Sequence, residues 1–204
     1  MRLRTLAGEG FSQNLIKGSR FCGMAAPITD PSDLEAMIAR ARADWPQANH
    51  HTYAYRLRDA SGQILYRSSD DGEPGGTAGR PIYTILDSQE LTGAGIVVSR
   101  IFGGVKLGTG GLVRAYGGTA RDAVQNAGII ERPIFLPFRI RCSTEQLGLI
   151  EAGLHRKGWN VQARAVEGAS AFLTISLPDE EKEPLQAWLS EVTSGRGVLE
   201  MLPD

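Results

Sequence analysis

Alternating apolar and polar positions predict several β-strands in the first hundred residues. Residues 11–28 (FSQNLIKGSRFCGMAAPI) predict one or two strands with a turn at Lys17-Gly18-Ser19. Residues 51–59 (HTYAYRLRD) alternate like a half-buried strand, and residues 63–68 (QILYRS) return as its hairpin partner. The continuous apolar run Ile96–Val98 is typical of a central strand, because such strands are covered on both faces.

Helical spacing with clear end signals predicts three helices in the same part of the chain. Residues 29–46 place Asp30 as an N-cap and Pro31 at the first helical position. Residues 80–91 begin a second helix with Pro81 near its first turn. Residues 108–128 predict a third, which is entered from a glycine-rich loop and ends at Gly128. Its expected buried stripe is Val113, Tyr116, Ala120, Val124 and Ala127.

The last third of the chain has a regular order of elements. We expect strands and helices alternating as βαββαβ over residues 138–143, 144–158, 159–168, 170–178, 179–195 and 196–202. This is the ferredoxin-like order, in which two helices cover one face of a four-stranded antiparallel sheet. The fold class is therefore α+β, with an N-terminal domain at residues 1–132 and a C-terminal domain at residues 133–204.

Composition narrows the class of protein without naming a function. A net charge of −1 excludes a strongly basic, histone-like protein, so only local clustering of cations could bind a polyanion. Cys22 and Cys142 lie far apart without CxxC spacing, which argues against a disulfide framework and a cysteine zinc site. We find no apolar signal region and no run of about 20 apolar residues. We expect a cytoplasmic protein without a membrane partner.

The most polar loop of the chain, within RSSDDGEPGGTAGRPIYTIL at residues 67–86, allows two interpretations. Asp70, Asp71 and Glu73 could bind Mg²⁺ or act in acid–base catalysis. Alternatively, they form an Asx-type turn that caps the next helix, with Gly72 and Gly79 supplying conformational freedom. No His, Cys or second carboxylate pair stands at a recognised ligand interval, so we expect no metal and no cofactor. We expect conformation to dominate over chemistry in this loop.

The adjacent histidines of NHHTYAY are a second candidate. His50 and His51 point to opposite faces in an extended segment, so only one could join a common site. A structural, hydrogen-bonded histidine is the alternative to His50 meeting the acidic loop.

A glycine-rich stretch, VVSRIFGGVKLGTGGLVRAYGG at residues 97–118, is the best candidate for anion binding. Its glycines would let backbone approach a ligand beside a helix N-terminus, and cations lie nearby. Tight packing of strand on helix is the alternative role of these glycines. The spacing fits neither a Walker loop nor GxGxxG. The expected anion or nucleic-acid site comprises Arg100, Gly103, Gly104, Lys106, Gly108, Gly110, Gly111, Arg114, Lys17 and Arg20.

Gly117 and Gly118 fall inside the same predicted helix. They cost about 1 kcal/mol each relative to alanine, so something must approach that surface closely or the helix bends there. Arg114 and Arg121 stand seven residues apart on one stripe of this helix.

The ordered motifs KGSRF, NHHTYAYR, SDDGEPGGTAGRPI and VVSRIFGGVKLGTGGLVRAY resemble the IMPACT family, in its bacterial two-domain branch. The resemblance covers residues 12–128 and departs at Ile101, where the family usually carries an aromatic residue. It implies an N-terminal domain of the ribosomal-protein and GHMP-kinase type. It further implies a C-terminal domain similar to the last domain of elongation factor G. Eukaryotic members act in translational control under stress, by competing for a protein partner.

Three hypotheses follow from the residues and the resemblance together. The first is a non-enzymatic regulator of translation that binds RNA or a ribosomal surface through the glycine-rich face. The second is an enzyme acting on a phosphorylated small molecule. The third is a protein-interaction module that docks through the uncovered face of the C-terminal sheet.

Overall fold

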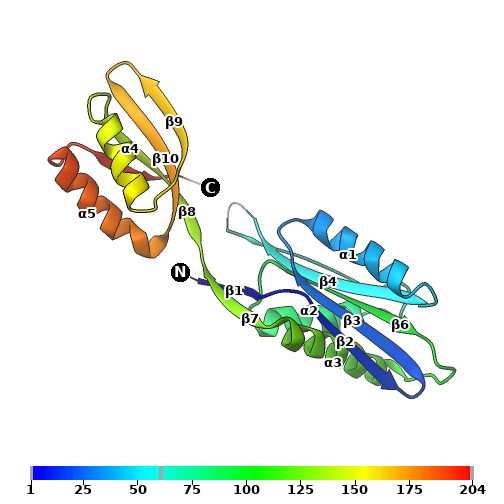
Figure 1. Cartoon of the computed structure of the whole chain (residues 1–204). Coiled ribbons are helices and arrows are strands. Elements are labelled where there is room, and N and C mark those ends of the chain that lie inside the picture. Colours follow the sequence, from blue (N-terminus) through cyan, green and yellow to red (C-terminus); the bar gives the residue numbers. More distant parts are fainter. Residues whose placement is uncertain (1, 60–61, 203–204) are drawn as a thin grey trace. The chain divides into compact units, whose positions relative to one another are not determined.

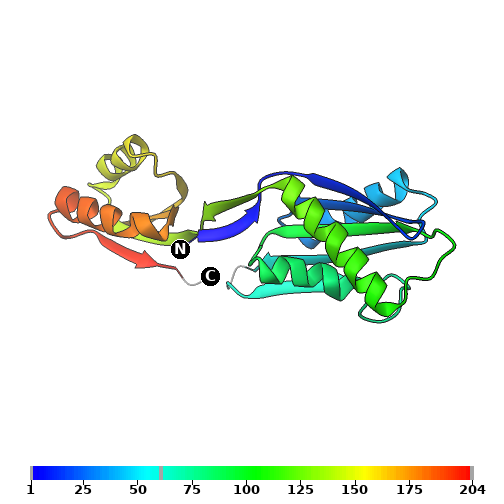
Figure 2. The same cartoon turned by 90° about the horizontal axis from the view of Figure 1, so that it is seen from below.

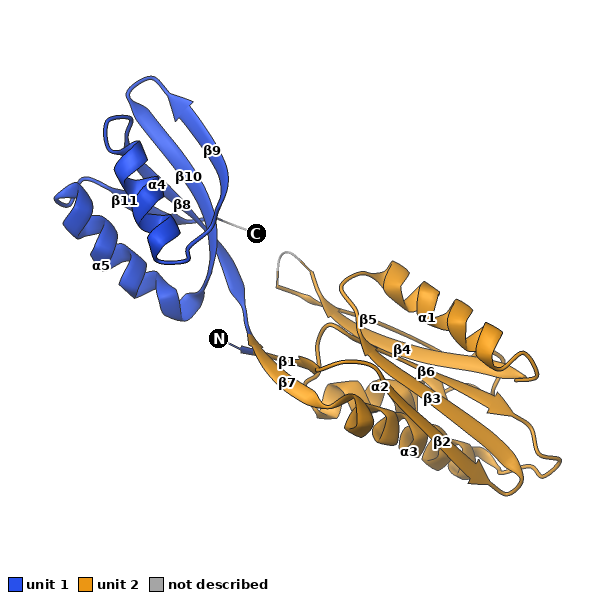
Figure 3. Cartoon of the chain, in the orientation of Figure 1, with its two compact units in different colours: residues 1–2, 133–204 blue, residues 3–132 orange. Residues whose placement is uncertain are grey.

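The computed structural model describes residues 2–59 and 62–202 and has a mixed α+β architecture. The chain forms two compact units, one of residues 3–132 and one of residues 133–204 together with the first two residues (Figure 3). The division between Arg132 and Pro133 separates two hydrophobic cores, and each unit is described by itself.

The first unit is built on a five-stranded sheet with the order β2-β3-β6-β4-β5, in which every neighbouring pair is antiparallel. Its strands and helices are β2 (Gly10–Ile16), β3 (Ser19–Pro27), α1 (Pro31–Asp44), β4 (His50–Arg58), β5 (Ile64–Ser69), α2 (Gly79–Ser88), β6 (Ala94–Ile101) and α3 (Thr109–Ala127). A two-stranded sheet pairs β1 (Arg2–Leu6) with β7 (Ile129–Pro133). The sequence pattern did not predict β1.

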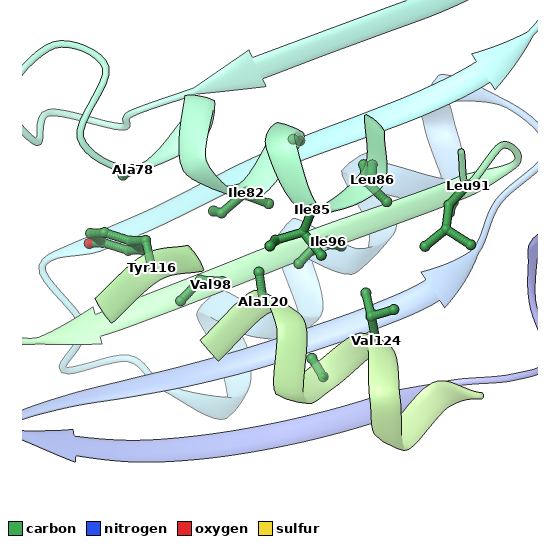
Figure 4. Packing of buried hydrophobic residues seen from close by; sticks show 14 of the residues in the cluster. Ala78, Ile82, Ile85, Leu86, Leu91, Ile96, Val98, Tyr116, Ala120 and Val124 are labelled. Carbon is green, nitrogen blue, oxygen red and sulfur yellow. The ribbon is translucent and has the colours of Figure 1, made fainter. Parts of the chain in front are cut away.

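Helices cover both faces of this sheet, with α1 on one face and α2 and α3 together on the other (Figures 1 and 2). The central strand β6 has apolar side chains on both faces, and each face needs a covering helix. Ile96 and Val98 pack toward α2 and α3, whereas Val97 joins the cluster under α1. The residues under α2 and α3 interdigitate in one continuous core (Figure 4). The predicted two-face burial of Ile96–Val98 is confirmed.

Local sequence signals fix the helix ends as expected. Asp30 caps α1 by accepting a hydrogen bond from the Ser32 N–H, and Asp33 accepts from the backbone at Thr29 and Asp30. Helix α3 ends at Gly128, with φ of 71°. The hairpin turn predicted at Lys17-Gly18-Ser19 is confirmed for Lys17 and Gly18, which have positive φ between β2 and β3, whereas Ser19 already begins β3.

The second unit has the predicted order βαββαβ. Its elements are β8 (Phe135–Ser143), α4 (Leu147–Arg156), β9 (Val161–Glu167), β10 (Ser170–Pro178), the short 3₁₀ turn η1 (Asp179–Glu181), α5 (Lys182–Thr193) and β11 (Val198–Met201). The sheet order is β11-β8-β10-β9, with antiparallel neighbours. Alternate residues of β10 are buried, from Ala171 to Leu177, and pack against α4 and α5. Trp159 and Trp188 meet edge to face, with ring centroids 5.8 Å apart.

Candidate functional site

The acidic loop between β5 and α2 begins with a helix cap. The Asp70 carboxylate accepts hydrogen bonds from the backbone N–H groups of Gly76, Ala78 and Gly79, at 2.7, 2.9 and 2.8 Å. Burial alone raises the pKa of Asp70, but these three bonds outweigh it and hold that pKa below its usual value. Asp70 therefore caps α2 through Ala78 and Gly79 and also holds Gly76 in the preceding turn, so these three N–H groups are not available to an outside anion.

Asp71 joins the same loop to the sheet. Its Oδ2 atom accepts a 2.6 Å hydrogen bond from the His51 backbone N–H on β4, and its carbonyl oxygen lies 2.7 Å from Nδ1 of His50. The turn is left-handed here, with φ of 42° at Asp71 and 86° at Gly72. The aspartates bond backbone N–H groups as expected, but they do not form Asx turns, which would bond the backbone two residues on. The partners of Asp70 lie six to nine residues further along the chain, and the partner of Asp71 lies on β4.

Glu73 reaches furthest into the first unit. Its Oε1 atom lies 2.6 Å from Nη1 of Arg100 on β6 and accepts a 2.7 Å hydrogen bond from the Tyr116 hydroxyl on α3. The side chains of Glu73 and Arg100 are only 4% and 7% exposed. Burial, reinforced by the bond to Glu73, raises the pKa of Tyr116 far above its ordinary value, so the hydroxyl stays protonated. The three residues form a buried ionic cluster that joins the loop, the sheet and α3.

The side chain of His50 meets the acidic loop, whereas His51 contacts the loop only through its backbone N–H. The Nε2 atom of His50 lies 3.9 Å from Oε1 of Glu73, and its side chain is 25% exposed. The Nδ1 atom of His51 lies 2.8 Å from the Ser99 hydroxyl, and burial lowers the pKa of His51. The two histidine side chains thus have separate partners, as their alternation along the strand predicts.

These contacts give each acidic side chain of the loop a structural partner. Asp70 caps a helix, Asp71 holds a strand and Glu73 neutralises a buried arginine. Among residues 2–59 and 62–202, no three His, Cys, Asp or Glu side chains gather as a metal site would require. Through these contacts the loop joins α2, β4 and β6, as its architectural interpretation expects. Gly79 shares this role, because a Cβ there would lie 2.7 Å from the backbone of Ser69.

The structure separates the predicted anion-binding residues from one another. Arg100 is 6% exposed and paired with Glu73, so it does not offer its guanidinium to solvent. Gly103 packs its backbone directly on Gly18, leaving no room for a side chain. Lys17, Arg20 and Lys106 are exposed.

The Gly18–Gly103 contact brings the β2–β3 turn beside the loop of residues 102–108, at one end of the five-stranded sheet (Figure 1). Ser19 secures it, because its hydroxyl oxygen accepts a 3.1 Å hydrogen bond from the Gly103 N–H. Phe102 in this loop is 45% exposed. Sequence reasoning noted the missing aromatic at Ile101 but did not assign a role to the ring beside it. We call Lys17, Arg20, Phe102 and Lys106 the loop surface.

The remaining glycines lie at the entry to α3. Gly104 and Gly108 have positive φ, of 85° and 73°, and Gly108 occupies the N-cap position without a side-chain hydrogen bond. Gly110 and Gly111 follow in the first turn of the helix. This part of the stretch combines turn geometry with an uncapped helix start.

A groove of about 740 Å³ runs between α2 and α3, and Arg114 lines it rather than the loop surface. Its wall residues are Gly76, Arg80, Pro81, Thr84, Ile85, Val113, Arg114, Gly117, Gly118 and Arg121. The prediction that Val113 is buried was wrong, because this side chain is 41% exposed in the groove. The common stripe of Arg114 and Arg121 was foreseen, but Arg80 was missed, since no sequence spacing places α2 against α3.

Comparisons with known proteins agree with the resemblance. A family model described as the Impact N-terminal domain matches residues 17–124. An IMPACT family member of Thermus thermophilus is 36% identical over 182 residues, covering 89% of this chain and 97% of the relative. The Escherichia coli family member YigZ is 34% identical over 189 residues, covering 92% and 90%.

A solved structure described only as a hypothetical protein superposes with a TM-score of 0.79 at 31% identity, covering 98% of this chain and 97% of the other. The match of the family model and the near-complete coverage of these relatives lead to one conclusion. The chain belongs to the IMPACT family.

Proposed function

We propose that this protein is a translation-related regulator that binds RNA or a ribosomal surface, and that it acts by binding rather than catalysis. The loop surface is the observation that carries the proposal. It presents three exposed cations and an exposed aromatic ring, with Lys17 in the β2–β3 turn, Arg20 at the start of β3, and Phe102 and Lys106 in the loop fastened to that turn. Cations for phosphates and an aromatic face for bases are the usual elements of single-stranded nucleic-acid binding.

Family membership supports a role in translation, because eukaryotic members of the family act in translational control under stress. The domain types implied by the resemblance point the same way. We propose that the first unit is of the ribosomal-protein and GHMP-kinase type, and that the second, with its βαββαβ order, is similar to the last domain of elongation factor G. Both types occur in proteins that contact RNA or the ribosome. Binding to a protein partner remains within the proposal, and no membrane partner is expected. In the described residues, no helix is long and apolar enough to cross a bilayer.

The use of the acidic loop supports a non-catalytic role. An acid–base or Mg²⁺ centre needs carboxylates that converge on substrate. Here Asp70, Asp71 and Glu73 each accept hydrogen bonds from a different part of the first unit.

Co-sedimentation with purified ribosomes and ribosomal subunits over a salt series tests the proposal. The test variant is Lys17→Ala/Arg20→Ala/Lys106→Ala. Its control is Arg42→Ala/Lys157→Ala/Lys182→Ala, which removes the same residue types from other exposed positions. Each phosphate contact contributes about 0.7 to the slope of log affinity against log salt on a single strand. We expect the test variant to lose about two from this slope and the control to keep it.

Two results would contradict the proposal. One is the absence of ribosome or RNA binding by the wild type at low salt. The other is equal loss of binding in the two triple variants, which would mean that total charge, rather than the loop surface, is responsible.

A further inference from the structure

The groove between α2 and α3 carries positive charges that are not neutralised by acidic residues in its wall. Arg80, Arg114 and Arg121 line it, and no Asp or Glu is among its wall residues. All three arginines are exposed, and none of their guanidinium groups forms a hydrogen bond or ion pair with the part of the chain that the structure describes. Elsewhere in the same unit, Arg100 and Arg40 have carboxylate partners.

Glycines keep this groove open. A Cβ at Gly76 or Gly118 would have no atom within 4 Å, and one at Gly117 would only reach van der Waals distance from Pro81. The positive φ of 75° accounts for glycine at Gly76. At Gly117 and Gly118 neither the backbone conformation nor the packing against described residues requires glycine, unlike the packing at Gly103 or Gly79. Two glycines inside α3 nevertheless cost helix stability relative to alanine. Open space for a molecule outside the chain explains them better than tight internal packing does.

The wall combines these charges with an apolar surface. Pro81 and Ile85 on α2 face Val113 on α3, and Val113 is 41% exposed. Arg114 and Arg121 are seven residues apart, which separates their Cα atoms by about 10 Å along the helix. A volume of about 740 Å³ lies within the range of small-molecule sites, which run from about 300 to 1,000 Å³. The groove thus offers cations for two or more negative charges and an apolar wall for an organic body.

We propose that the α2–α3 groove binds a small phosphorylated organic ligand of nucleotide size. A guanidinium binds phosphate oxygens in bidentate fashion, and a phosphate group concentrates up to two negative charges and three acceptor oxygens in one place. Arg80, Arg114 and Arg121 hold the phosphate groups, and Pro81, Ile85 and Val113 contact the remainder of the ligand. The site serves as an effector site, separate from the loop surface.

Calorimetric titration of the full chain with ADP, pyrophosphate, adenosine and a short oligoadenylate tests this assignment. ADP supplies a diphosphate and a planar organic body. Pyrophosphate supplies only the phosphate groups, and adenosine supplies only the organic body. The oligonucleotide distinguishes a free nucleotide from the same chemistry within RNA. We expect ADP to bind at millimolar concentration or below, pyrophosphate to bind more weakly and adenosine not to bind.

Variants assign this binding to the groove. Arg80→Ala and Arg121→Ala should each weaken ADP binding about 10-fold or more, since each removes a charge-assisted hydrogen bond. Gly118→Leu should abolish it by filling the groove, and open space at this position lets the variant fold, as circular dichroism would verify. Arg42→Ala, on α1 across the sheet, is the control and should leave the affinity unchanged. The Lys17→Ala/Arg20→Ala/Lys106→Ala variant should also bind ADP normally, so that failure of either proposal is seen independently.

Four outcomes would overturn the inference. They are no saturable binding of ADP or pyrophosphate at millimolar concentration, equal binding of adenosine and ADP, and ADP binding that survives Gly118→Leu. The fourth is binding of the oligonucleotide alone, lost in the groove variants, which would assign the groove to RNA instead.

Discussion

The buried pair of Glu73 and Arg100 gives the sharpest test of how the first unit is held together. Glu73→Gln keeps the shape of the side chain but removes its negative charge. Arg100 is then left buried without its counter-ion, and its Nε atom already has no hydrogen-bond partner among the residues that the structure describes. Breaking a buried ion pair from one side costs about 3–5 kcal/mol, because an uncompensated charge stays in a poorly polarisable interior. We expect a loss of this size in the free energy of unfolding.

A variant at Tyr116 separates the contribution of its hydrogen bond from that of the ion pair. Tyr116→Phe removes a hydrogen bond to a charged acceptor, for which we expect a loss of about 1.5–3 kcal/mol. After Glu73→Gln the same hydroxyl bonds only to a neutral amide oxygen, and a neutral bond contributes about 0.5–1.5 kcal/mol. The double variant should therefore be more stable than the sum of the single losses predicts, by about 1 kcal/mol.

Urea unfolding measured by hydrogen–deuterium exchange of β6 peptides reads the first unit separately from the second. Glu9→Gln is the matched control, because Glu9 also pairs with an arginine, Arg40, at 2.9 Å, but both side chains are about half exposed. Such a surface pair contributes about 0–1 kcal/mol. If Glu73→Gln costs no more than Glu9→Gln, or if the losses from Glu73→Gln and Tyr116→Phe simply add, our account of the buried cluster is wrong.

Two further predictions concern the loop and the helices beside it. Asp70→Ala should destabilise the first unit by about 2 kcal/mol, since it removes three backbone hydrogen bonds at the start of α2. The free energy of unfolding, measured in urea, should differ less between this variant and the wild type as the pH falls below about 4. The reason is that a carboxyl whose pKa is lowered in the folded state stabilises that state only while it is ionised. An unchanged difference at pH 2 would contradict this. Gly118→Ala should raise the thermal midpoint through about 1 kcal/mol of helix propensity, whereas Gly79→Ala should lower it, because its Cβ would overlap Ser69. Equal shifts for the two alanine variants in thermal melts would refute the distinction.

Signals carried by a few neighbouring residues predicted most of the fold. The cap at Asp30, the turn at Lys17-Gly18 and the helix end at Gly128 are decided by local backbone geometry, so sequence alone locates them. The βαββαβ order of the second unit follows from alternation and helical periods in the same way. The short strand Arg2–Leu6 was not predicted, because its partner, β7, lies more than 120 residues away in the sequence.

The candidate sites were harder to predict, since they depend on contacts between distant segments. Arg100 looked like a ligand-binding cation until the fold paired it with Glu73, 27 residues earlier. Val113 fits the apolar stripe of α3, but α2 does not cover it, and it lines a groove instead. No periodicity in one helix reveals where its neighbour ends. The pairing of Arg80 with the stripe of Arg114 and Arg121 therefore required the structure.

The loop of residues 70–79 has the composition of a mobile linker, yet its contacts imply that it opens only rarely. Opening it would break the cap on α2, the bond from Asp71 to β4 and the buried pair with Arg100 in a single event. Segments secured this way open together with the surrounding cooperative unit, not by local fraying. The amides of Gly76 and Ala78 should consequently exchange about as slowly as those of β6, and the loop should resist proteases that cut glycine-rich connections elsewhere.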